Sequence, residues 1–383
     1  MGERVLVVGG AGFIGSHLVD ALIARGDVVR VLDDLLPQAH PTGTARWTHR
    51  EAELVVGDVR DRAAVDAALE GVSLVFHQAG MVGNGQSMYD VRRYSDVNVV
   101  GTATLIEAIL ARRAQVRLFV VASSMVVYGD GAYACEEHGA LSRALRPDDR
   151  LFARRWEPVC PMCGREVTPI PTGEEHVLQP SSTYGISKLA QEQLALVLGK
   201  ANGLPTIALR YLNTYGSRQA MSNPYTGVAA IMAARLLNGR PPTIFEDGQQ
   251  LRDLTHVSDV VRANLAAAGA PENALYLAYN IGTGRSIRIE QIALALAREL
   301  GRDIEPEITG EFRAGDIRHC FADVSRARSL LGWEAKVMFA EGARELAAWA
   351  AGERPEDLTE RANAELRTKG LLSGGRQAVM APK

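Results

Sequence analysis

The stretch VLVVGGAGFIGSHLVDAL, residues 5–22, decides the fold of this chain. Its first residues are apolar and predict a buried strand, and apolar residues then recur at the spacing of a helix. Between them lie Gly9, Gly12 and Gly15, which follow the spacing G-x-x-G-x-x-G, while Gly10 completes an overlapping G-x-G-x-x-G. Glycines at such a turn let a pyrophosphate approach the backbone at the helix N-terminus. The stretch therefore predicts a dinucleotide-binding turn.

The same alternation of strand and helix continues along the chain to about residue 125 and resumes after residue 180. We expect strands at 28–34, 53–58, 74–80, 116–124 and 205–213, and helices at 63–71, 97–112 and 181–203. The strands are almost continuously apolar, which is typical of a parallel sheet covered by helices on both faces. The predicted fold is α/β, a Rossmann-type doubly wound parallel sheet with a smaller C-terminal α/β substrate domain.

Composition limits the classes of partner. The chain has 383 residues, of which 47% are hydrophobic, and a net charge of −3. This balance argues against a nucleic-acid or membrane-surface partner, and no apolar stretch approaches the length of a membrane helix. The N-terminus begins directly with a strand and shows no export signal. We therefore expect a cytoplasmic protein whose thiols stay reduced.

Two acids follow the second predicted strand. Asp33 and Asp34 lie near the position expected for the acid that binds the ribose of a dinucleotide. A carboxylate accepts hydrogen bonds from ribose hydroxyls and repels a 2′-phosphate. We therefore predict NAD, rather than NADP, as the cofactor.

The candidate catalytic residues come from two segments. The sequence YGISK places Tyr184 and Lys188 four residues apart, on one face of a predicted helix. An ammonium group beside a phenol lowers the pKa of the phenol, which predicts Tyr184 as a proton acceptor. Ser124 ends the fifth predicted strand, where doubly wound sheets bind their ligands. We expect Ser124 and Tyr184 to act on one substrate oxygen, with Lys188 stabilising the phenolate.

Residues 130–179 break the pattern and contain two short metal-binding motifs, CEEH and CPMC. The predicted ligands are Cys135, His138, Cys160 and Cys163. Three cysteines and one histidine form a common structural zinc site with tetrahedral geometry. His176 is a competing ligand outside the two motifs, and Cys320 is expected to pack in the interior. Because both ends of this insert adjoin the candidate catalytic residues, we expect a zinc-stapled flap beside the pocket.

These motifs divide the chain into five segments. We expect an NAD-binding Rossmann core at 1–129, a zinc-binding insert at 130–179, the catalytic helix and sixth strand of the core at 180–220, a mainly substrate-binding part at 221–352, and a C-terminal helix and tail at 353–383. The last residues, 373–383, have the composition of a frayed terminus.

Further motifs in the same order carry a family resemblance over about residues 3–350. They are GGAGFIGSHL, GDVRD, HQAG, ASSMVVYG, YGISK, RDLTHVSDVVRANL and RAGDIRHCFADVSRARSLLGW. Together they resemble the extended short-chain dehydrogenase/reductase family, and within it the NAD-dependent nucleotide-sugar epimerase/dehydratase group, of which UDP-glucose 4-epimerase is the familiar member.

The resemblance implies a role for further residues. The cofactor would be bound by Gly9, Gly12, Phe13, Ile14, Gly15, Asp33, Asp34, Asp58, Val59, Gln78, Ala79, Gly80, Asn98, Tyr184 and Lys188. The nucleoside-diphosphate sugar would be bound by Ser124, Met125, Asn213, Arg252 and Arg313, the two arginines neutralising the diphosphate. Members of this group dimerise through two helices, which here correspond to 92–113 and 181–200, so a homodimer is expected.

The implied reaction is epimerisation of the sugar, with C4 as the expected centre. Tyr184 would take a proton from a hydroxyl while the hydride of the same carbon moves to NAD, and the ketone would turn over before reduction. A 4,6-dehydratase would carry an Asp-Glu pair where this chain has Met125 and Val126, which counts against that activity. A decarboxylase of the same family and a non-catalytic NAD-binding sensor protein are less favoured, the latter because Ser124, Tyr184 and Lys188 are all present.

Overall fold

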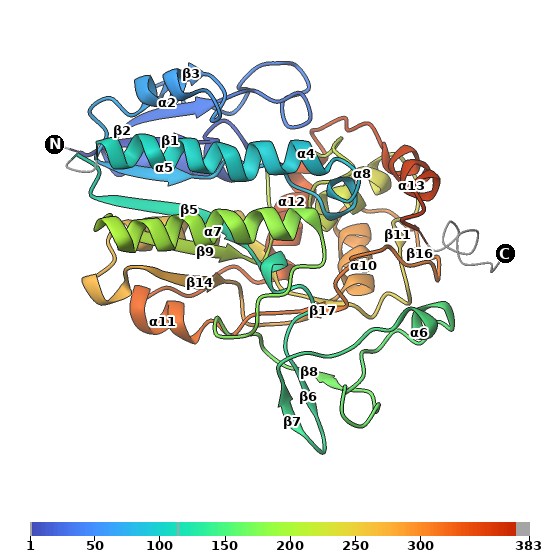
Figure 1. Cartoon of the computed structure of the whole chain (residues 1–383). Coiled ribbons are helices and arrows are strands. Elements are labelled where there is room, and N and C mark those ends of the chain that lie inside the picture. Colours follow the sequence, from blue (N-terminus) through green and yellow to red (C-terminus); the bar gives the residue numbers. More distant parts are fainter. Residues whose placement is uncertain (1, 113–114, 373–383) are drawn as a thin grey trace.

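The structure, a computed structural model, describes residues 2–112 and 115–372 (Figure 1). In this part of the chain seven parallel strands form one sheet, in the order β14-β9-β5-β4-β1-β2-β3. The strands are β1 Arg4–Val8, β2 Val28–Asp33, β3 Glu53–Val56, β4 Leu74–His77, β5 Leu118–Ser124, β9 Thr206–Tyr211 and β14 Leu277–Ile281. The doubly wound parallel sheet predicted from the sequence is confirmed, whereas the predicted tail at 373–383 lies outside the described residues.

Helices cover both faces of the sheet, which explains why its strands are apolar throughout. In β1, Val5 and Val7 join one buried cluster and Leu6 and Val8 join the other. The first face is covered by α1 Phe13–Ala24, α9 Val257–Ala268 and α11 Ser325–Leu331, and the second by α2 Arg62–Ala68, α5 Gly101–Ala111 and α7 Thr183–Asn202. Figure 1 shows α5 and α7 lying side by side across the second face.

The order of the strands determines where a ligand binds. From β1 the chain goes to β2 and β3 on one side, and then returns to β4 on the other side of β1. At this switch point, the chain runs in opposite directions after the carboxyl ends of β1 and β4. A crevice therefore forms between the two connections. The glycine turn after β1 therefore lies at the position where doubly wound sheets bind dinucleotides.

The C-terminal part contributes both to the sheet and to a separate core. β14 and α9 belong to the segment 221–352, yet they complete the sheet and its first helical face. The remaining helices are α8 Val228–Leu237, α10 Ile289–Glu299, α12 Phe339–Ala350 and α13 Thr359–Thr368. α8, α10 and α12 enclose an apolar core of their own, which includes Met232, Ile292 and Leu346. Short strands link this core to the sheet: β10 Asn213–Tyr215, β11 Thr243–Ile244, β12 Leu251–Arg252, β13 Leu254–His256, β15 Ile287–Arg288, β16 Glu307–Ile308 and β17 His319–Cys320.

The insert folds into a small sheet that projects away from the main one (Figure 1). Its elements are β6 Tyr133–Cys135, β7 Gly139–Leu141, α6 Asp148–Phe152 and β8 Thr168–Pro169, with the strands in the order β7-β6-β8. Its buried apolar cluster is small, consisting of Tyr133, Cys135, Leu141, Cys160 and Val167. Two of those five residues are candidate metal ligands.

Candidate active site

A cavity of about 900 Å³ opens at the carboxyl ends of the strands, between the sheet and the C-terminal part. It brings together every residue that the sequence analysis assigned to cofactor or substrate except Asn98: Gly9, Gly12, Phe13, Ile14, Gly15, Asp33, Asp34, Asp58, Val59, Gln78, Ala79, Gly80, Ser124, Met125, Tyr184, Lys188, Asn213, Arg252 and Arg313. These residues come from widely separated parts of the chain. They share one cavity because the parallel strands end at the same edge.

The glycine turn has no room for side chains. Gly9 has a φ of +79°, and a Cβ there would lie 2.5 Å from the amide nitrogen of Ala79. A Cβ at Gly15 would lie 2.1 Å from the carbonyl oxygen of Gly9. The backbone therefore lines the cavity directly before the first turn of α1, which fits the pyrophosphate of a dinucleotide.

The acids after β2 have the positions expected for a ribose site. The Asp33 carboxylate accepts hydrogen bonds from the amides of Ala11 (3.0 Å) and Leu35 (2.9 Å). Burial raises the pKa of Asp34, and the neighbouring Asp33 carboxylate raises it further. Arg60, a cation beside this region, forms a bidentate pair with Asp58, and its hydrogen bonds lower the pKa of that carboxyl. This acidic environment suits ribose hydroxyls better than a 2′-phosphate.

Ser124 and Tyr184 lie close together at the edge of the sheet. Ser124 ends β5, and its Oγ accepts a weak hydrogen bond from the amide of Val126 (3.4 Å). Tyr184 lies in the first turn of α7, which is capped by the Ser182 side chain accepting from the Gly185 amide (3.1 Å). Ser124 and Tyr184 share a hydrogen bond, and it lowers the pKa of Tyr184. Both hydroxyls can therefore reach the same substrate oxygen.

The pKa of Tyr184 differs from the sequence-based expectation. Burial raises it to about 12, which outweighs the hydrogen bond from Ser124. Burial also lowers the pKa of Lys188 to about 7, although Glu192 acts in the opposite direction. The Lys188 ammonium donates to the carbonyl oxygen of Ala122 and to Gln191 Oε1 (2.6 Å). The prediction that Lys188 lowers the tyrosine pKa is therefore wrong for this ligand-free state, because desolvation is the larger effect.

Asn98 lies behind the cavity wall rather than in it. Its side chain accepts from the amide of Met81 (2.7 Å) and donates to the Met81 carbonyl (3.1 Å) and to Ser187 Oγ (2.9 Å). Because Ser187 belongs to α7, these bonds join the segment after β4 to the catalytic helix. Asn98 thus orients both walls of the cavity without lining it.

Asn213, Arg252 and Arg313, which the resemblance assigns to the nucleoside-diphosphate sugar, differ in how many of their polar atoms already have partners. The Asn213 Oδ1 atom is buried without a partner in the described part of the chain. Arg252 donates from Nη1 to the carbonyls of Leu251 (2.8 Å) and Arg318 (3.0 Å), and from Nη2 to that of Ile317 (2.6 Å). Within the described residues, the Nε–H and one Nη2–H of Arg252 have no acceptor. These two groups form an edge of the guanidinium that can bind an oxyanion bidentately.

Arg313 is the second cation of this wall. Its guanidinium lies 4.5 Å from the centre of the Phe245 ring, and its Nε donates to Asp316 (2.7 Å). These contacts hold the guanidinium at the cavity surface. With Arg252 it gives this wall two positive charges.

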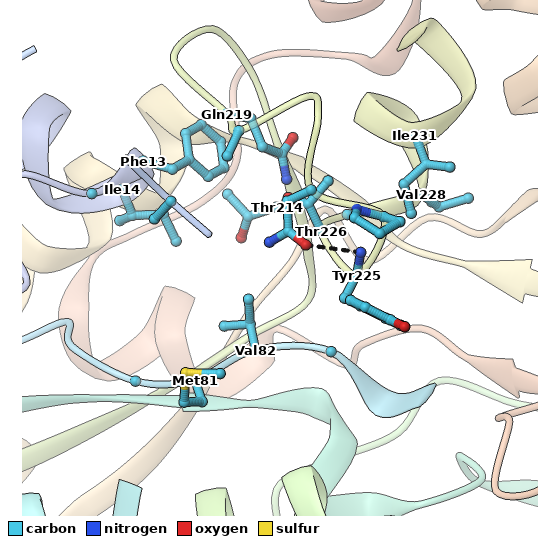
Figure 2. A pocket seen from close by; sticks show the side chains of 18 of the residues that line it. Phe13, Ile14, Met81, Val82, Thr214, Gln219, Tyr225, Thr226, Val228 and Ile231 are labelled. Atoms are coloured by element: carbon cyan, nitrogen blue, oxygen red, sulfur yellow. Dashed lines mark hydrogen bonds between the residues drawn. The ribbon is translucent and has the colours of Figure 1, made fainter. Parts of the chain in front are cut away.

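Sequence reasoning missed a further group of residues that line the cavity. Figure 2 shows Met81 and Val82 facing Thr214, Gln219, Tyr225, Thr226, Val228 and Ile231 across the cavity. Gln219, Tyr225 and Thr226 belong to the loop between β10 and α8. In this loop the Tyr225 amide donates to Asn223 Oδ1 (3.0 Å). The loop precedes α8 and has no periodicity or motif, so only its position after the sixth strand of the sequence could have indicated a ligand.

The four predicted metal ligands form one cluster. The ligand atoms of Cys135, His138, Cys160 and Cys163 all lie within 4.8 Å of one another. His138 Nδ1 is 3.5 Å from Cys135 Sγ and 3.6 Å from Cys160 Sγ. The competing ligand His176 is absent from the cluster and packs against Tyr128. Three thiols and an imidazole at this separation can hold a tetrahedral zinc ion.

The insert is not a flap over the cavity. None of its described residues, 130–179, lines the cavity. Cys320 is buried at 1% exposure in β17, as expected for a packing residue. The insert instead contacts Phe312, which precedes Arg313, and Glu246, so it lies beside the substrate wall without lining the cavity. That it shapes access or specificity stays a prediction.

The sequence profile of the NAD dependent epimerase/dehydratase family matches residues 5–148 and 160–282. The chain belongs to this family. It is similar to the dTDP-L-rhamnose 4-epimerase of Burkholderia thailandensis, with 35% identity over 92% of this chain and 96% of the relative. It is an enzyme of the NAD-dependent nucleotide-sugar epimerase type.

Solved structures agree with the fold. The UDP-glucose 4-epimerase of Thermotoga maritima, solved with UDP-glucose, has a TM-score of 0.73 and 31% identity, covering 90% of this chain and 98% of the other. The UDP-glucose 4-epimerase of Thermus thermophilus, solved with NAD, has a TM-score of 0.72 and 30% identity, covering 91% and 99%. In the described residues, no helix is both long and apolar enough to cross a membrane.

Proposed function

We propose that this protein is an NAD-dependent 4-epimerase of a nucleoside-diphosphate sugar. The observation that carries the proposal is the shared cavity, in which Ser124, Tyr184 and Lys188 lie with the glycine turn. Met125 and Val126 follow Ser124, and both are buried and apolar. They can neither donate nor accept a proton, so they do not support elimination of water from the sugar.

NAD, when bound, accepts a hydride from the sugar carbon and returns it. Tyr184 takes the hydroxyl proton in the first half of the reaction and returns it in the second. Ser124 hydrogen-bonds the same oxygen and holds it near the phenol. The Lys188 ammonium, buried below them, and the positive charge of bound NAD would together favour the charged form of Tyr184.

The diphosphate of the substrate is assigned to the wall opposite the catalytic residues. Arg252 offers a free guanidinium edge and Arg313 a second positive charge. The unpaired Oδ1 of Asn213 is an acceptor, so it suits a hydroxyl of the ligand and not a diphosphate oxygen. Anchoring the diphosphate leaves the sugar attached only by its anomeric oxygen. The ketone formed by oxidation can therefore rotate and present its other face for reduction.

The second part of the proposal is a structural zinc ion held by Cys135, His138, Cys160 and Cys163. Four protein ligands leave no open position, so the metal does no chemistry. The insert has only the small apolar cluster described above, and metal binding supplies the folding energy that this cluster lacks.

The third part is a homodimer through α5 and α7. Val100 directly precedes α5, and Ile186 and Val197 lie on α7; these side chains are 50%, 58% and 59% exposed. Aliphatic side chains gathered on two adjacent helices suit a four-helix interface with a second copy.

The test is incubation of the enzyme with a panel of nucleoside-diphosphate sugars that includes UDP-glucose and dTDP-L-rhamnose, the products being identified by NMR. We expect one substrate to equilibrate with its C4 epimer without added NAD. A 4-keto-6-deoxy sugar or carbon dioxide as product would refute the proposal, as would the absence of any epimer across the panel.

A further inference from the structure

The insert packs against the segment that carries Arg313. The rings of Phe152 and Phe312 meet edge to face, with centroids 5.4 Å apart, and Trp156 lies 6.3 Å from Phe312. Phe312 is 3% exposed and directly precedes Arg313. The apolar side of the insert is therefore fixed to one end of the substrate wall.

An ionic contact fixes the other end. Glu157, three residues before the second metal motif, accepts from Arg318 Nε (3.1 Å) and lies 2.8 Å from His319 Nε2. Although burial acts to raise it, the bonds from His319 and Arg318 hold the pKa of Glu157 at about 2. The carboxylate is thus charged at neutral pH and paired on both oxygens.

The Arg318 side chain is fully buried, so its positive charge must be stabilised by the acidic groups that it contacts. Besides Glu157 it donates to Glu246 (2.8 Å) and to both carboxylate oxygens of Asp247 (2.6 and 2.9 Å). A second arginine, Arg146 of the insert, donates to Glu246 (2.6 Å) and to the carbonyl of Asp316 (3.2 Å). Insert and substrate wall therefore form one network of buried charges.

This network reaches Arg252 through the backbone. The carbonyls of Ile317 and Arg318 accept from the Arg252 guanidinium, at 2.6 and 3.0 Å. His319 Nδ1 accepts from the Leu251 amide (3.0 Å), beside the pairing of β12 with β17. Glu157 thus holds Arg318, whose carbonyl accepts from Arg252, and His319, whose ring accepts from the amide of Leu251 next to Arg252.

We propose that Glu157 is a positioning residue for the diphosphate of the substrate, through which the metal-bound insert sets the affinity for the nucleotide sugar. The inference rests on the proposed function for the identity of the ligand. Ser124, Tyr184 and Lys188 belong to β5 and α7. Among the described residues they share no hydrogen bond or ion pair with Glu157, Arg318 or His319, although Tyr184 packs against the apolar cluster that includes Ile317. Glu157 therefore affects binding of the substrate and leaves the chemical step and NAD binding unchanged.

The test uses Glu157→Gln in the full-length, metal-replete protein, with Glu166→Gln as the matched control. Glu166 lies in the same insert and pairs with Arg150, which also donates to the backbone carbonyl of Glu157 (3.4 Å). The control therefore removes a charge near Glu157 but leaves the bonds of the Glu157 carboxylate with Arg318 and His319 in place. Three quantities are measured: the affinity for UDP and dTDP by calorimetry, amide hydrogen exchange of residues 313–320, and KM and kcat with the best substrate of the panel.

We expect Glu157→Gln to weaken nucleoside-diphosphate binding and raise KM by about tenfold, a size typical of coupling between linked sites. Exchange at 313–320 should accelerate, while kcat, zinc content and NAD content stay at the level of the control. Equal affinity and equal exchange in the two variants would overturn the inference. If the parent binds neither UDP nor dTDP, the proposed function fails. If UDP and dTDP do not bind, the exchange data still test the contact between the insert and the wall. Exchange at 313–320 that is equal in Glu157→Gln and the control overturns the positioning role as well, whereas faster exchange in Glu157→Gln upholds the contact of Glu157 with this segment.

Discussion

At the scale of single residues, burial and charge compete in this site. Tyr184 is protonated in the ligand-free protein because burial raises its pKa to about 12. The same burial lowers the pKa of Lys188 to about 7, so its proton is held loosely. Proton transfer by Tyr184 thus depends on the charge that arrives with the cofactor and substrate.

Replacing Tyr184 by Phe tests this role directly. We expect kcat to fall at least about 100-fold, the usual contribution of a positioned proton acceptor, while bound NAD is retained. Turnover is followed by NMR, and NAD by its release on denaturation. Tyr276→Phe is the control, because Tyr276 does not line the cavity. A Tyr184→Phe enzyme within a few-fold of the parent would disprove the mechanism.

His77 at the end of β4 makes the stability of the protein pH-dependent. It is 1% exposed and bonds to Thr102 (2.9 Å), and burial, followed by the charge of Lys188, lowers its pKa to about 3. In the unfolded chain a histidine binds a proton near pH 6.5. Between about pH 3 and about pH 6.5, His77 is protonated in the unfolded chain and neutral in the folded protein. The folded state therefore loses stability as the pH falls through this range.

We therefore expect the free energy of unfolding to fall less steeply in His77→Gln than in the parent. The difference in slope should approach about 1.4 kcal/mol per pH unit below pH 6. Urea unfolding at several pH values between about 7 and 5 measures it. Parallel slopes for the two proteins would show that folding does not lower the pKa of His77.

At the scale of elements, the insert differs from the helices and strands of the sheet. The sheet is held by large apolar clusters on both faces, whereas the apolar cluster of the insert has five buried residues, two of them candidate ligands. We therefore expect β6, β7 and β8 to lose their order without the proposed metal.

The double variant Cys160→Ser/Cys163→Ser should therefore lose the metal and become sensitive to protease between residues 130 and 179. The parent should contain about one zinc per chain by elemental analysis. NAD content should be unchanged, because no insert residue in the described chain lines the cavity. Cys320→Ala, at a buried thiol outside the cluster, should keep its zinc. A metal-free parent, purified without chelator, would rule out this site.

At the scale of the whole molecule, α5 and α7 present the apolar face proposed for the dimer. Val197→Asp places a charge in its centre, and we expect the dimer to weaken at least about 100-fold, since an unpaired carboxylate is costly to bury. Light scattering coupled to gel filtration measures the mass. Leu294→Asp is the control, because Leu294 is an exposed aliphatic residue on α10. A monomeric parent, or a dimeric Val197→Asp variant, would contradict the proposed interface.

Much of this architecture follows from local sequence. The glycine spacing, the apolar strands and the Tyr184–Lys188 pair each depend on residues a few positions apart, because strand and helix periods are local properties. The two metal motifs are local as well, and their joint cluster required only that the two segments meet. For these reasons the sheet, the cavity lining and the four-residue cluster were predictable.

Tertiary structure alone decided the rest. The pKa of Tyr184 depends on burial, which is the sum of contacts from distant segments, so the sequence predicted its direction wrongly. The loop of Gln219 and Tyr225 reaches the cavity only because the chain returns over the sheet after β9. The insert adjoins Ser124 and Tyr184 in sequence, yet its partners are Arg318 and Phe312. Adjacency along the chain fixes only where a segment starts and ends. The apolar and charged groups that it must bury determine which surface it covers.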